Sequence, residues 1–331
     1  MSDSASSSAA PSSTGSPSAA PSAANAAIRV TCPICPQACR LTEGQLGHCG
    51  ARAARAGQVV PTNYGQASAL ALDPIEKKPL ARFHPGSMIL SYGSYGCNLS
   101  CPFCQNASIA QVSTPATAEA GGGATGHADV RTVGQNSSPA APQLPPTHAI
   151  SPEELMEKAL DLRSRGNIGI AYTYNEPLVG YEFVLDSARQ AHQAGLLNVL
   201  VSNGYINARP LKHLLPHLDA ANIDLKGFTQ RFYDLVGAPL GLETVKRTIT
   251  LMAPALHLEV TTLIIPGHND SPEEIAALAT WLAAVDPGIA LHLTRFHPAH
   301  RMLDLAPTPR QTIHRLVAVA QRSGLAHVFA G

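Results

Sequence analysis

Three cysteines that stand within eight residues of one another predict a metal centre. Cys97, Cys101 and Cys104 follow the spacing C-x3-C-x2-C. Three thiolates can hold three corners of a [4Fe–4S] cube, which most often takes four, so the fourth iron is left open to a substrate or cofactor. The alternatives are a structural zinc knuckle and inert buried thiols. Zinc sites usually combine paired C-x2-C units into four ligands, and no fourth ligand lies close by in this stretch.

A second cysteine group precedes the first and has four members within eighteen residues: Cys32, Cys35, Cys39 and Cys49. Four soft ligands so close together indicate a small, closed metal site with glycines at its turns. His48 could replace one of the thiolates. The metal is left open between structural zinc and an auxiliary iron–sulfur cluster, and free thiols are the alternative.

Low-complexity stretches divide the chain of 331 residues. Residues 1–28 are nearly all Ser, Ala and Pro, which offer too little apolar surface to offset ordering entropy, so we expect a disordered tail. Residues 113–148 are rich in Gly, Ala, Pro, Ser and Thr and are expected to be an insertion. Residues 29–86 are expected to form a cysteine-rich module with a linker, and 87–331 one barrel of ordinary size.

Charge and cysteine usage exclude several classes of protein. The formal net charge is zero and the sequence pI is about 7.2, so there is no electrostatic footprint for nucleic acid or for an anionic membrane. No apolar run reaches the length of a membrane span. Seven cysteines in two tight groups do not resemble a secreted disulfide framework, and a reducing cytoplasm is expected.

From residue 87 onward, short apolar runs alternate with stretches of helical periodicity, which predicts a parallel α/β fold. Six β/α units would form a partial (β/α)6 barrel. Ser151 with Glu154, and Ser271 with Glu274, have the spacing of helix capping boxes. The expected strands cover 88–95, 168–173, 197–201, 220–225, 256–264, 289–295 and 326–330. The expected helices cover 151–165, 178–194, 208–217, 271–284 and 308–323, with two more before residue 252.

The stretch before the barrel looks less regular. Residues 59–82 carry polar turns, and residues 73–80 read Asp-Pro-Ile-Glu-Lys-Lys-Pro-Leu. The two prolines argue against a helix there. The prediction is therefore a connecting segment whose charged side chains are solvated.

Polar residues follow the expected strands at their carboxyl ends, where barrels of parallel strands hold their chemistry. Glu176 follows the second strand and Asn203 the third. Asp224 and Lys226 end the fourth strand on one side of it, because side chains alternate along a strand. Two such charges inside a barrel are costly unless they pair with each other or with a ligand.

The chain resembles the radical S-adenosylmethionine (radical SAM) superfamily. The cysteine spacing with aromatic Phe103 before the last cysteine carries this resemblance. More closely, the chain is similar to the AmmeMemoRadiSam-system enzymes, which are relatives of the pyruvate formate-lyase activating enzymes. That likeness rests on the four-cysteine knuckle and on residues 73–80, 97–106, 171–177, 222–227, 261–270 and 295–298. The insertion departs from the family pattern, and so does the pair Tyr174-Asn175, which stands where the family usually has two glycines.

The resemblance implies a role for each strand-end residue. SAM would chelate the open iron through its methionine amine and carboxylate, with Glu176 accepting from its ammonium group. Asn203 would face SAM, and Asp224 and Lys226 would lie near the methionine end or the substrate. The resemblance also places Phe103 near the cluster and adenine, Pro266 in a turn on adenine, and His297 near the ribose.

The implied activity is reductive cleavage of SAM to a 5′-deoxyadenosyl radical that abstracts a hydrogen atom. The implied partners are a reductant such as flavodoxin or ferredoxin and a protein substrate, either a glycyl radical enzyme or a partner from the same system. Radical modification of a small molecule or an RNA base is a second possibility, although the neutral charge disfavours RNA. The third is a non-enzymatic iron–sulfur or zinc scaffold, which would bind metal without turning over SAM.

Overall fold

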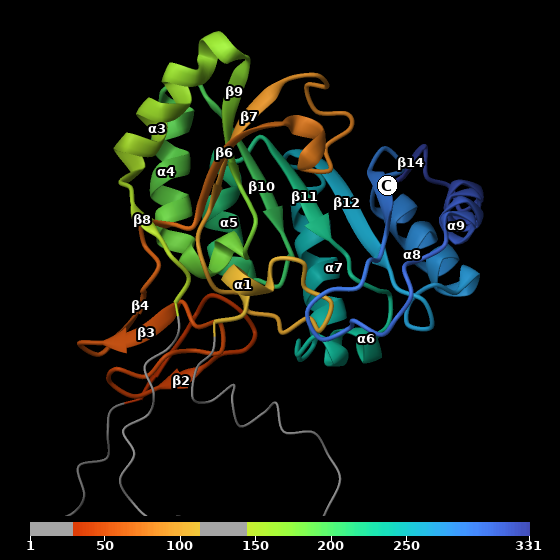
Figure 1. Cartoon of the computed structure of the whole chain (residues 1–331), viewed down its shortest axis with the longest axis horizontal. Helices are drawn as coiled ribbons and strands as arrows, with labels where there is room; N and C mark the ends of the chain where they lie inside the picture. The colour runs from red at the N-terminus through yellow and green to blue at the C-terminus, as the bar shows by residue number, and fades with distance from the viewer. Residues whose placement is uncertain (1–28, 113–143) are drawn as a thin grey trace, which may run out of the picture.

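The computed structural model describes residues 29–112 and 144–331, and a central eight-stranded sheet organises them (Figure 1). Its order is β14-β13-β12-β11-β10-β9-β7-β6. The expected tail at 1–28 and residues 113–143 of the expected insertion lie outside the described residues. The strands are β6 (Ala69–Pro74), β7 (Met88–Gly93), β9 (Asn167–Tyr172), β10 (Leu197–Ser202), β11 (Ala220–Asp224), β12 (His257–Ile264), β13 (Ala290–Arg295) and β14 (His327–Ala330).

Strand pairing makes this sheet an open barrel. Neighbouring strands from β7 to β14 pair in parallel, and β6 pairs antiparallel with β7. Among the described strands, β14 and β6 end the order and do not pair with each other. The predicted α/β fold with a central parallel sheet is confirmed, and its last short strand adds to the edge of the sheet beside β13.

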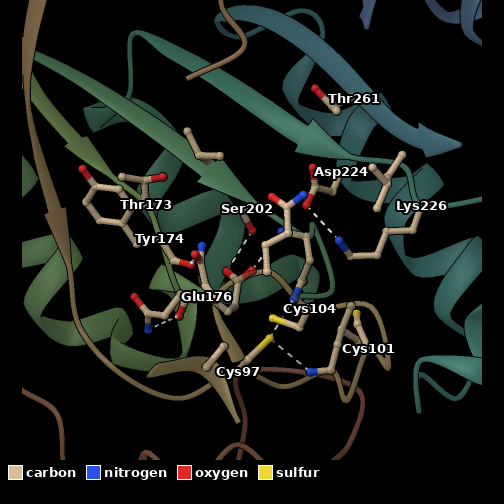
Figure 2. A pocket seen from close by; sticks show the side chains of 18 of the residues that line it. Cys97, Cys101, Cys104, Thr173, Tyr174, Glu176, Ser202, Asp224, Lys226 and Thr261 are labelled. Carbon is tan, nitrogen blue, oxygen red and sulfur yellow. Dashed lines mark hydrogen bonds and ion pairs between the residues drawn. The ribbon is translucent and has the colours of Figure 1, made fainter. Parts of the chain in front are cut away.

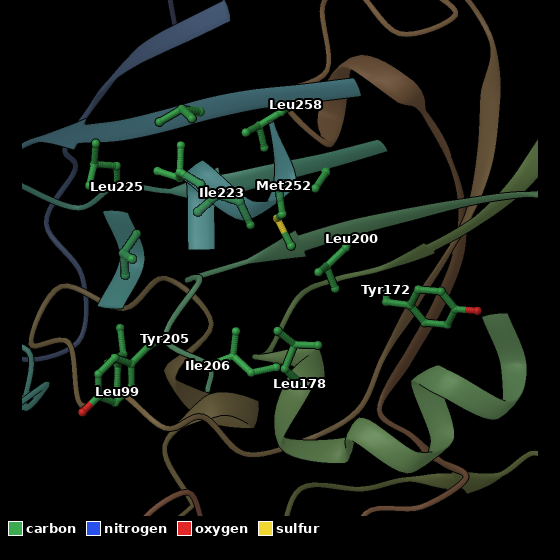
Figure 3. Packing of buried hydrophobic residues seen from close by; sticks show 14 of the residues in the cluster. Leu99, Tyr172, Leu178, Leu200, Tyr205, Ile206, Ile223, Leu225, Met252 and Leu258 are labelled. Atoms are coloured by element: carbon green, nitrogen blue, oxygen red, sulfur yellow. The ribbon is translucent and has the colours of Figure 1, made fainter. Parts of the chain in front are cut away.

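Helices connect the parallel strands and pack against the sheet (Figure 1). The strands are almost continuously buried, as parallel strands covered by helices require. Figure 3 shows Leu200, Ile223 and Met252 meeting in this core. None of the described helices combines the length and apolarity needed to cross a membrane. The helices are α1 (Ala107–Ala110), α3 (Pro152–Asp161), α4 (Tyr181–Gln193), α5 (Ala208–Leu214), α6 (Gln230–Leu235), α7 (Gly241–Met252), α8 (Pro272–Val285) and α9 (Arg310–Arg322).

The two predicted capping boxes have different outcomes. At α3, the side chains of Ser151 and Glu154 each accept from the backbone N–H of the other residue, so the box is complete. At α8, the Ser271 hydroxyl accepts from the Glu274 N–H, but the Glu274 carboxylate accepts from the N–H of Phe228 at 2.6 Å. Glu274 therefore ties α8 to the loop that follows β11.

The N-terminal residues form small hairpins below the sheet, on the side of α1 (Figure 1). Strand β1 (Val30–Thr31) pairs with β2 (Arg40–Leu41), and β3 (Arg52–Arg55) pairs with β4 (Gln58–Pro61). Cys32, Ile34 and Cys35 belong to the same apolar cluster as the barrel core. The end of the expected insertion is part of the fold, since β8 (His148–Ala149) pairs with β5 (Gln66–Ala67).

The predicted solvated linker at 73–80 is wrong. Residues 69–74 form edge strand β6, and Ile75–Lys77 form one 3-10 turn, η1. Asp73 is 8% exposed and Lys78 is 2% exposed. Their burial is possible because the Lys78 Nζ donates to the Asp73 carboxylate at 2.9 Å, so each charge is compensated by the other. Two charged residues five positions apart in the sequence therefore form a buried pair.

Candidate active site

A cavity of about 440 Å³ opens at the carboxyl ends of the parallel strands (Figure 2). The loop after β7 brings three thiols into its wall, and the loops after the next three strands bring polar side chains. The structure therefore gathers most of the predicted site residues in one place. Those that line it are Cys97, Cys101, Phe103, Cys104, Glu176, Asn203, Asp224 and Lys226.

Burial controls the protonation of the three thiols. It raises the pKa of Cys101 to about 11, against the opposing effect of the nearby Lys226 ammonium. Burial likewise raises the pKa of Cys97 and of Cys104. The thiols therefore stay neutral until a bound metal displaces their protons.

A glycine holds the cysteine loop against the N-terminal hairpins. Gly96 has a φ of +88°, and a Cβ there would lie 2.6 Å from the carbonyl oxygen of Cys49 and 2.6 Å from the Cβ of Ala51. The next residue, Cys97, donates its N–H to that Cys49 carbonyl at 3.2 Å. Only glycine permits this close approach, so the position of the cysteine loop depends on the four-cysteine segment.

Glu176 is the most enclosed carboxylate of the cavity, at 3% exposure. Its Oε1 accepts from the Ser202 hydroxyl at 2.8 Å and from the Leu178 N–H at 3.1 Å. Its Oε2 accepts from the Asn203 N–H at 2.8 Å. Burial raises the pKa of Glu176 to about 7, and these hydrogen bonds limit the rise. The carboxylate is therefore oriented precisely and titrates near neutral pH.

Asn203 connects the carboxylate to the thiols. Its Nδ2 lies 3.6 Å from the Cys97 Sγ and donates to the Asn98 Oδ1 at 2.8 Å. Its Oδ1 accepts from the Tyr205 N–H, which fixes the orientation of the amide. An N–H directed at a thiolate stabilises added negative charge on a metal–sulfur centre.

Asp224 and Lys226 pair with each other, which is one of the two arrangements that the sequence left open, with 2.9 Å between Nζ and Oδ2 (Figure 2). Burial opposes the charge of Lys226, but the Asp224 carboxylate outweighs it and raises the pKa of the ammonium group. Asn269 positions this strand end, because its Nδ2 donates to the Lys226 carbonyl at 2.8 Å and its Oδ1 accepts from the Ile265 N–H at 2.7 Å. Asn269, which lies in the turn that contains Pro266, therefore supports the site from outside.

The remaining predicted residues lie at different depths. Phe103 is buried, lines the cavity and has its ring centroid 5.9 Å from that of Phe232, so it serves the core as well. Pro266 is half-buried and His297 is exposed, and neither lines the cavity. Their predicted contacts with adenine and ribose stay predictions.

Sequence reasoning missed several residues of the cavity wall. They come from the segment after β6 and from the last two long strands. Alternation along the strands could have indicated Thr261 and Leu263, but nothing local indicated that the segment after β6 folds into the barrel. Among the missed residues are Lys77, Lys78, Pro79, Thr261, Leu263, Thr294 and Arg295.

The structure explains why Tyr174 can occupy a position where the family usually has glycine. It keeps a left-handed backbone with φ +72°, which a glycine would adopt without strain. Its hydroxyl donates to the Asp73 Oδ2 at 2.6 Å, and the Lys78 Nζ lies 4.7 Å from its ring centroid. The tyrosine thus connects the loop that carries Glu176 to the buried pair of Asp73 and Lys78. These contacts offset its backbone strain.

The four N-terminal cysteines share a second, much smaller cavity. Its volume is about 10 Å³, enough for a single water-sized sphere. Burial raises the pKa of Cys35 and of Cys49 to about 12, and neighbouring thiols add to the rise. Cys32, Cys35, Cys39, His48 and Cys49 all contribute to the wall.

The donor set of the large cavity fits an iron–sulfur cube. Within residues 29–112 and 144–331, no three His, Cys, Asp or Glu side chains converge on one metal position. A four-iron cube is larger than an ion, so its thiolates must surround a volume rather than converge on a point. Three thiols around a cavity of about 440 Å³ meet that requirement and leave room for a further ligand.

Two curated proteins illustrate what this chain is similar to in sequence. An uncharacterized protein of Methanocaldococcus jannaschii is 34% identical over 306 residues, which cover 92% of this chain and 81% of that protein. The isethionate sulfite-lyase activating enzyme of Desulfovibrio desulfuricans is 25% identical over 146 residues, which cover 43% of this chain and 46% of that enzyme.

Solved structures match at lower identity and with TM-scores below 0.5. A domain of a pyruvate-formate lyase-activating enzyme from Bacteroides vulgatus has 18% identity and a TM-score of 0.44, covering 49% of this chain and 98% of that one. A radical SAM methyltransferase from Sphaerobacter thermophilus has 15% identity and a TM-score of 0.48, covering 75% and 67%. The family model described as the radical SAM superfamily matches residues 91–281, more than half of the chain. This chain belongs to the radical SAM superfamily.

Proposed function

We propose that this protein holds a [4Fe–4S] cluster with Cys97, Cys101 and Cys104 and cleaves SAM reductively for hydrogen-atom abstraction. The observation that carries the proposal is the shared cavity, in which the three thiols face Glu176 and the Asp224–Lys226 pair. When bound, the cluster would supply the electron that cleaves SAM to methionine and a 5′-deoxyadenosyl radical. Flavodoxin or ferredoxin is the expected reductant, and the free thiols suit a reducing cytoplasm.

Glu176 is the proposed acceptor for the SAM ammonium group. Its Oε1 already accepts two hydrogen bonds, whereas its Oε2 accepts only one, from Asn203. A carboxylate oxygen can accept two, so Oε2 has a position left for the ligand. The ammonium charge would also favour the ionised form of a carboxyl group whose pKa is about 7 in the unliganded protein.

The other strand-end residues complete the proposed cofactor site. Asn203 directs its side-chain amide toward the Cys97 sulfur, and Lys226 brings a positive charge beside Cys101. Both would stabilise the negative charge that the thiolates carry once metal binds. Phe103, Pro266 and His297 are proposed contacts of the adenine and ribose.

The acceptor of the radical has two candidates. A glycyl radical on a partner protein follows from the likeness to the isethionate sulfite-lyase activating enzyme, which covers less than half of this chain. A small molecule is favoured by a specific observation: three of the missed wall residues, Lys77, Lys78 and Arg295, are cationic.

We further propose that Cys32, Cys35, Cys39 and Cys49 bind one metal ion of the zinc type rather than a second cluster. The volume of about 10 Å³ supports an ion, because a four-iron cube would not fit without displacing the surrounding chain. The four thiols line one cavity without converging on one position, so metal binding would require their side chains to rearrange. His48 is an alternative ligand.

Anaerobic reconstitution tests the enzymatic proposal. The protein is loaded with iron and sulfide, reduced with dithionite and given SAM, and 5′-deoxyadenosine is measured by chromatography. The wild type is expected to form the product, and Cys101→Ala is expected to form none and to lose the cluster absorbance. Cleavage at the wild-type rate in Cys101→Ala would overturn the proposal. A loaded cluster that never yields product, with candidate substrates present, would favour the scaffold alternative.

A further inference from the structure

The far end of the large cavity is basic. Strand β6 runs antiparallel to β7, so its carboxyl end lies at the amino ends of the parallel strands, opposite the cysteine loop. Lys77, Lys78 and Pro79 follow at this end and line the cavity. The Pro79 carbonyl accepts from the Asn222 Nδ2 on β11 at 2.8 Å, which anchors the segment beneath the barrel. We call these three residues the floor of the cavity.

The floor carries more positive than negative charge. One carboxylate, Asp73, lies 2.9 Å from the Lys78 Nζ and 3.3 Å from the Lys77 Nζ. The Tyr174 hydroxyl also donates to this carboxylate (Figure 2 shows Tyr174 at the cavity). Burial opposes its charge, yet these donors hold the pKa of Asp73 well below its usual range. A single anion thus faces two cations, and one positive charge is left over.

Arg295 adds a third cation from the carboxyl ends of the parallel strands, where the cysteine loop also lies. It ends β13 and lines the same cavity. Its Nε donates to the Thr308 carbonyl at 2.7 Å, which fixes the side chain. In the part of the chain that the structure describes, no hydrogen bond occupies its two terminal nitrogens. A guanidinium held in this way is prepared to bind a carboxylate or phosphate with both nitrogens.

The proposed cofactor site uses the charges of Glu176, Asp224 and Lys226 but not those of the floor lysines and Arg295. Glu176 would meet the SAM ammonium, and Asp224 and Lys226 neutralise each other. The floor lysines and Arg295 would then face the substrate with only Asp73 to balance them. Lys78 is buried but paired with Asp73, whereas Lys77 is 66% exposed and Arg295 is half-buried. The excess positive charge is therefore available at the cavity surface, where it favours an anionic ligand.

We propose that the substrate is a small molecule with a phosphate or carboxylate group that binds between Lys77, Lys78 and Arg295. This inference rests on the proposed function, because it assigns the other charged residues to SAM. The anion would orient the substrate so that the carbon to be attacked lies toward the cysteine loop. Lys78 and Tyr174 hold the floor in place, and Lys77, whose side chain is 66% exposed, can turn toward the ligand at little cost.

Calorimetric titration of two probes into the reconstituted, SAM-loaded, unreduced protein tests the proposal. The probes are inorganic pyrophosphate and succinate, each at constant ionic strength. At least one is expected to bind with one site per chain, and Lys77→Gln and Arg295→Gln should each weaken it about tenfold, as the loss of one charge-assisted hydrogen bond predicts. The exposed Lys212 on α5 supplies the control, and Lys212→Gln should bind as the wild type does.

Each outcome has one meaning. Binding of pyrophosphate alone assigns a phosphorylated substrate, and binding of succinate alone a carboxylate. Binding of neither probe, or equal binding by the wild type and both variants, overturns the inference.

The buried pair needs a variant of its own. Lys78→Met alone would leave the Asp73 carboxylate buried without its partner. The double variant Asp73→Asn/Lys78→Met removes both charges, and it should also weaken binding. The titration contains no reductant, so it measures binding without SAM cleavage. If the proposed cleavage activity failed, the binding results could still be interpreted.

Discussion

The two cysteine groups differ in the space that surrounds them. Four cysteines line a cavity of about 10 Å³, whereas three cysteines line one of about 440 Å³ that also holds carboxylates, amides and cations. The small cavity suits the single ion proposed for it, and the large one has room for the proposed cluster and a further ligand. Cavity volume and wall chemistry therefore support different proposals for the two groups, which cysteine counts alone do not distinguish.

Metal analysis of single cysteine variants gives the largest expected effect. Cys101→Ala should lose the iron of the cluster and keep the metal of the small cavity, because the two sets of ligands share no residue. Cys35→Ala should lose the metal of the small cavity. The measurement is metal content per chain for iron and zinc. Iron at two clusters per chain in the wild type would contradict the assignment of a single ion to the small cavity.

Removing a carboxylate should affect the large cavity alone. Glu176→Gln should weaken SAM binding about tenfold to a hundredfold, since it removes a charged hydrogen-bond acceptor. In the wild type, SAM affinity should fall as the pH drops through 7, because protonation of a group whose pKa is about 7 takes away the acceptor. Equilibrium dialysis with labelled SAM between pH 6 and pH 8 measures both effects. A pH dependence that persists in Glu176→Gln would assign it to another group.

A substitution beside the small cavity is expected to lower the stability of the protein without changing a cysteine. Arg52 lines it, is buried, and forms two hydrogen bonds of 2.6 and 2.7 Å with Glu182 on α4. Breaking a buried ion pair costs about 3–5 kcal/mol, and about 2 kcal/mol is expected for Arg52→Met because Glu182 is 38% exposed. Chemical denaturation measures the loss. The exposed Arg55 on β3 provides the control, and Arg55→Met should change stability little.

The smallest expected effect is on the reduction potential. Asn203→Ala removes the amide that approaches the Cys97 sulfur, so the potential of the cluster should become more negative. Ser202→Ala removes a hydroxyl that contacts Glu176 but no thiol, so it should change SAM affinity and leave the potential unchanged. A redox titration followed by spectroscopy distinguishes the two variants. Equal shifts in both would assign the effect to general disturbance of the loop.

The site residues at the strand ends could be predicted from the sequence, whereas the floor of the cavity could not. Cys97, Glu176 and Asn203 each follow a strand that a local apolar pattern reveals, and parallel strands bring their ends together. Lys78 was assigned to solvent, because its partner Asp73 and its neighbour Tyr174 could be recognised only once β6 had been placed beside β7. Local pattern locates strand ends, whereas burial of a charge depends on tertiary contacts.

The same limit applies to the fold. The parallel strands and their helices were predicted within a few residues, because periodicity and capping residues are local signals. Edge strand β6 was missed because its pairing partner lies beyond a turn that contains two prolines. Glu274 satisfied the spacing of a capping box, but its carboxylate accepts from the part-buried N–H of Phe228, a partner that lies far away in the sequence.

The order in which the cavity wall appears along the chain bears on how the protein matures. Cys97, Cys101 and Cys104 leave the ribosome before Glu176, Asn203 and Lys226, which enclose them in the finished fold. Until β10 and β11 have joined the sheet, the thiols lack the neighbours that bury them. During synthesis the thiols are therefore open to solutes on more sides than in the finished fold. After the sheet is complete, any metal or oxidant must reach them through the mouth of the cavity.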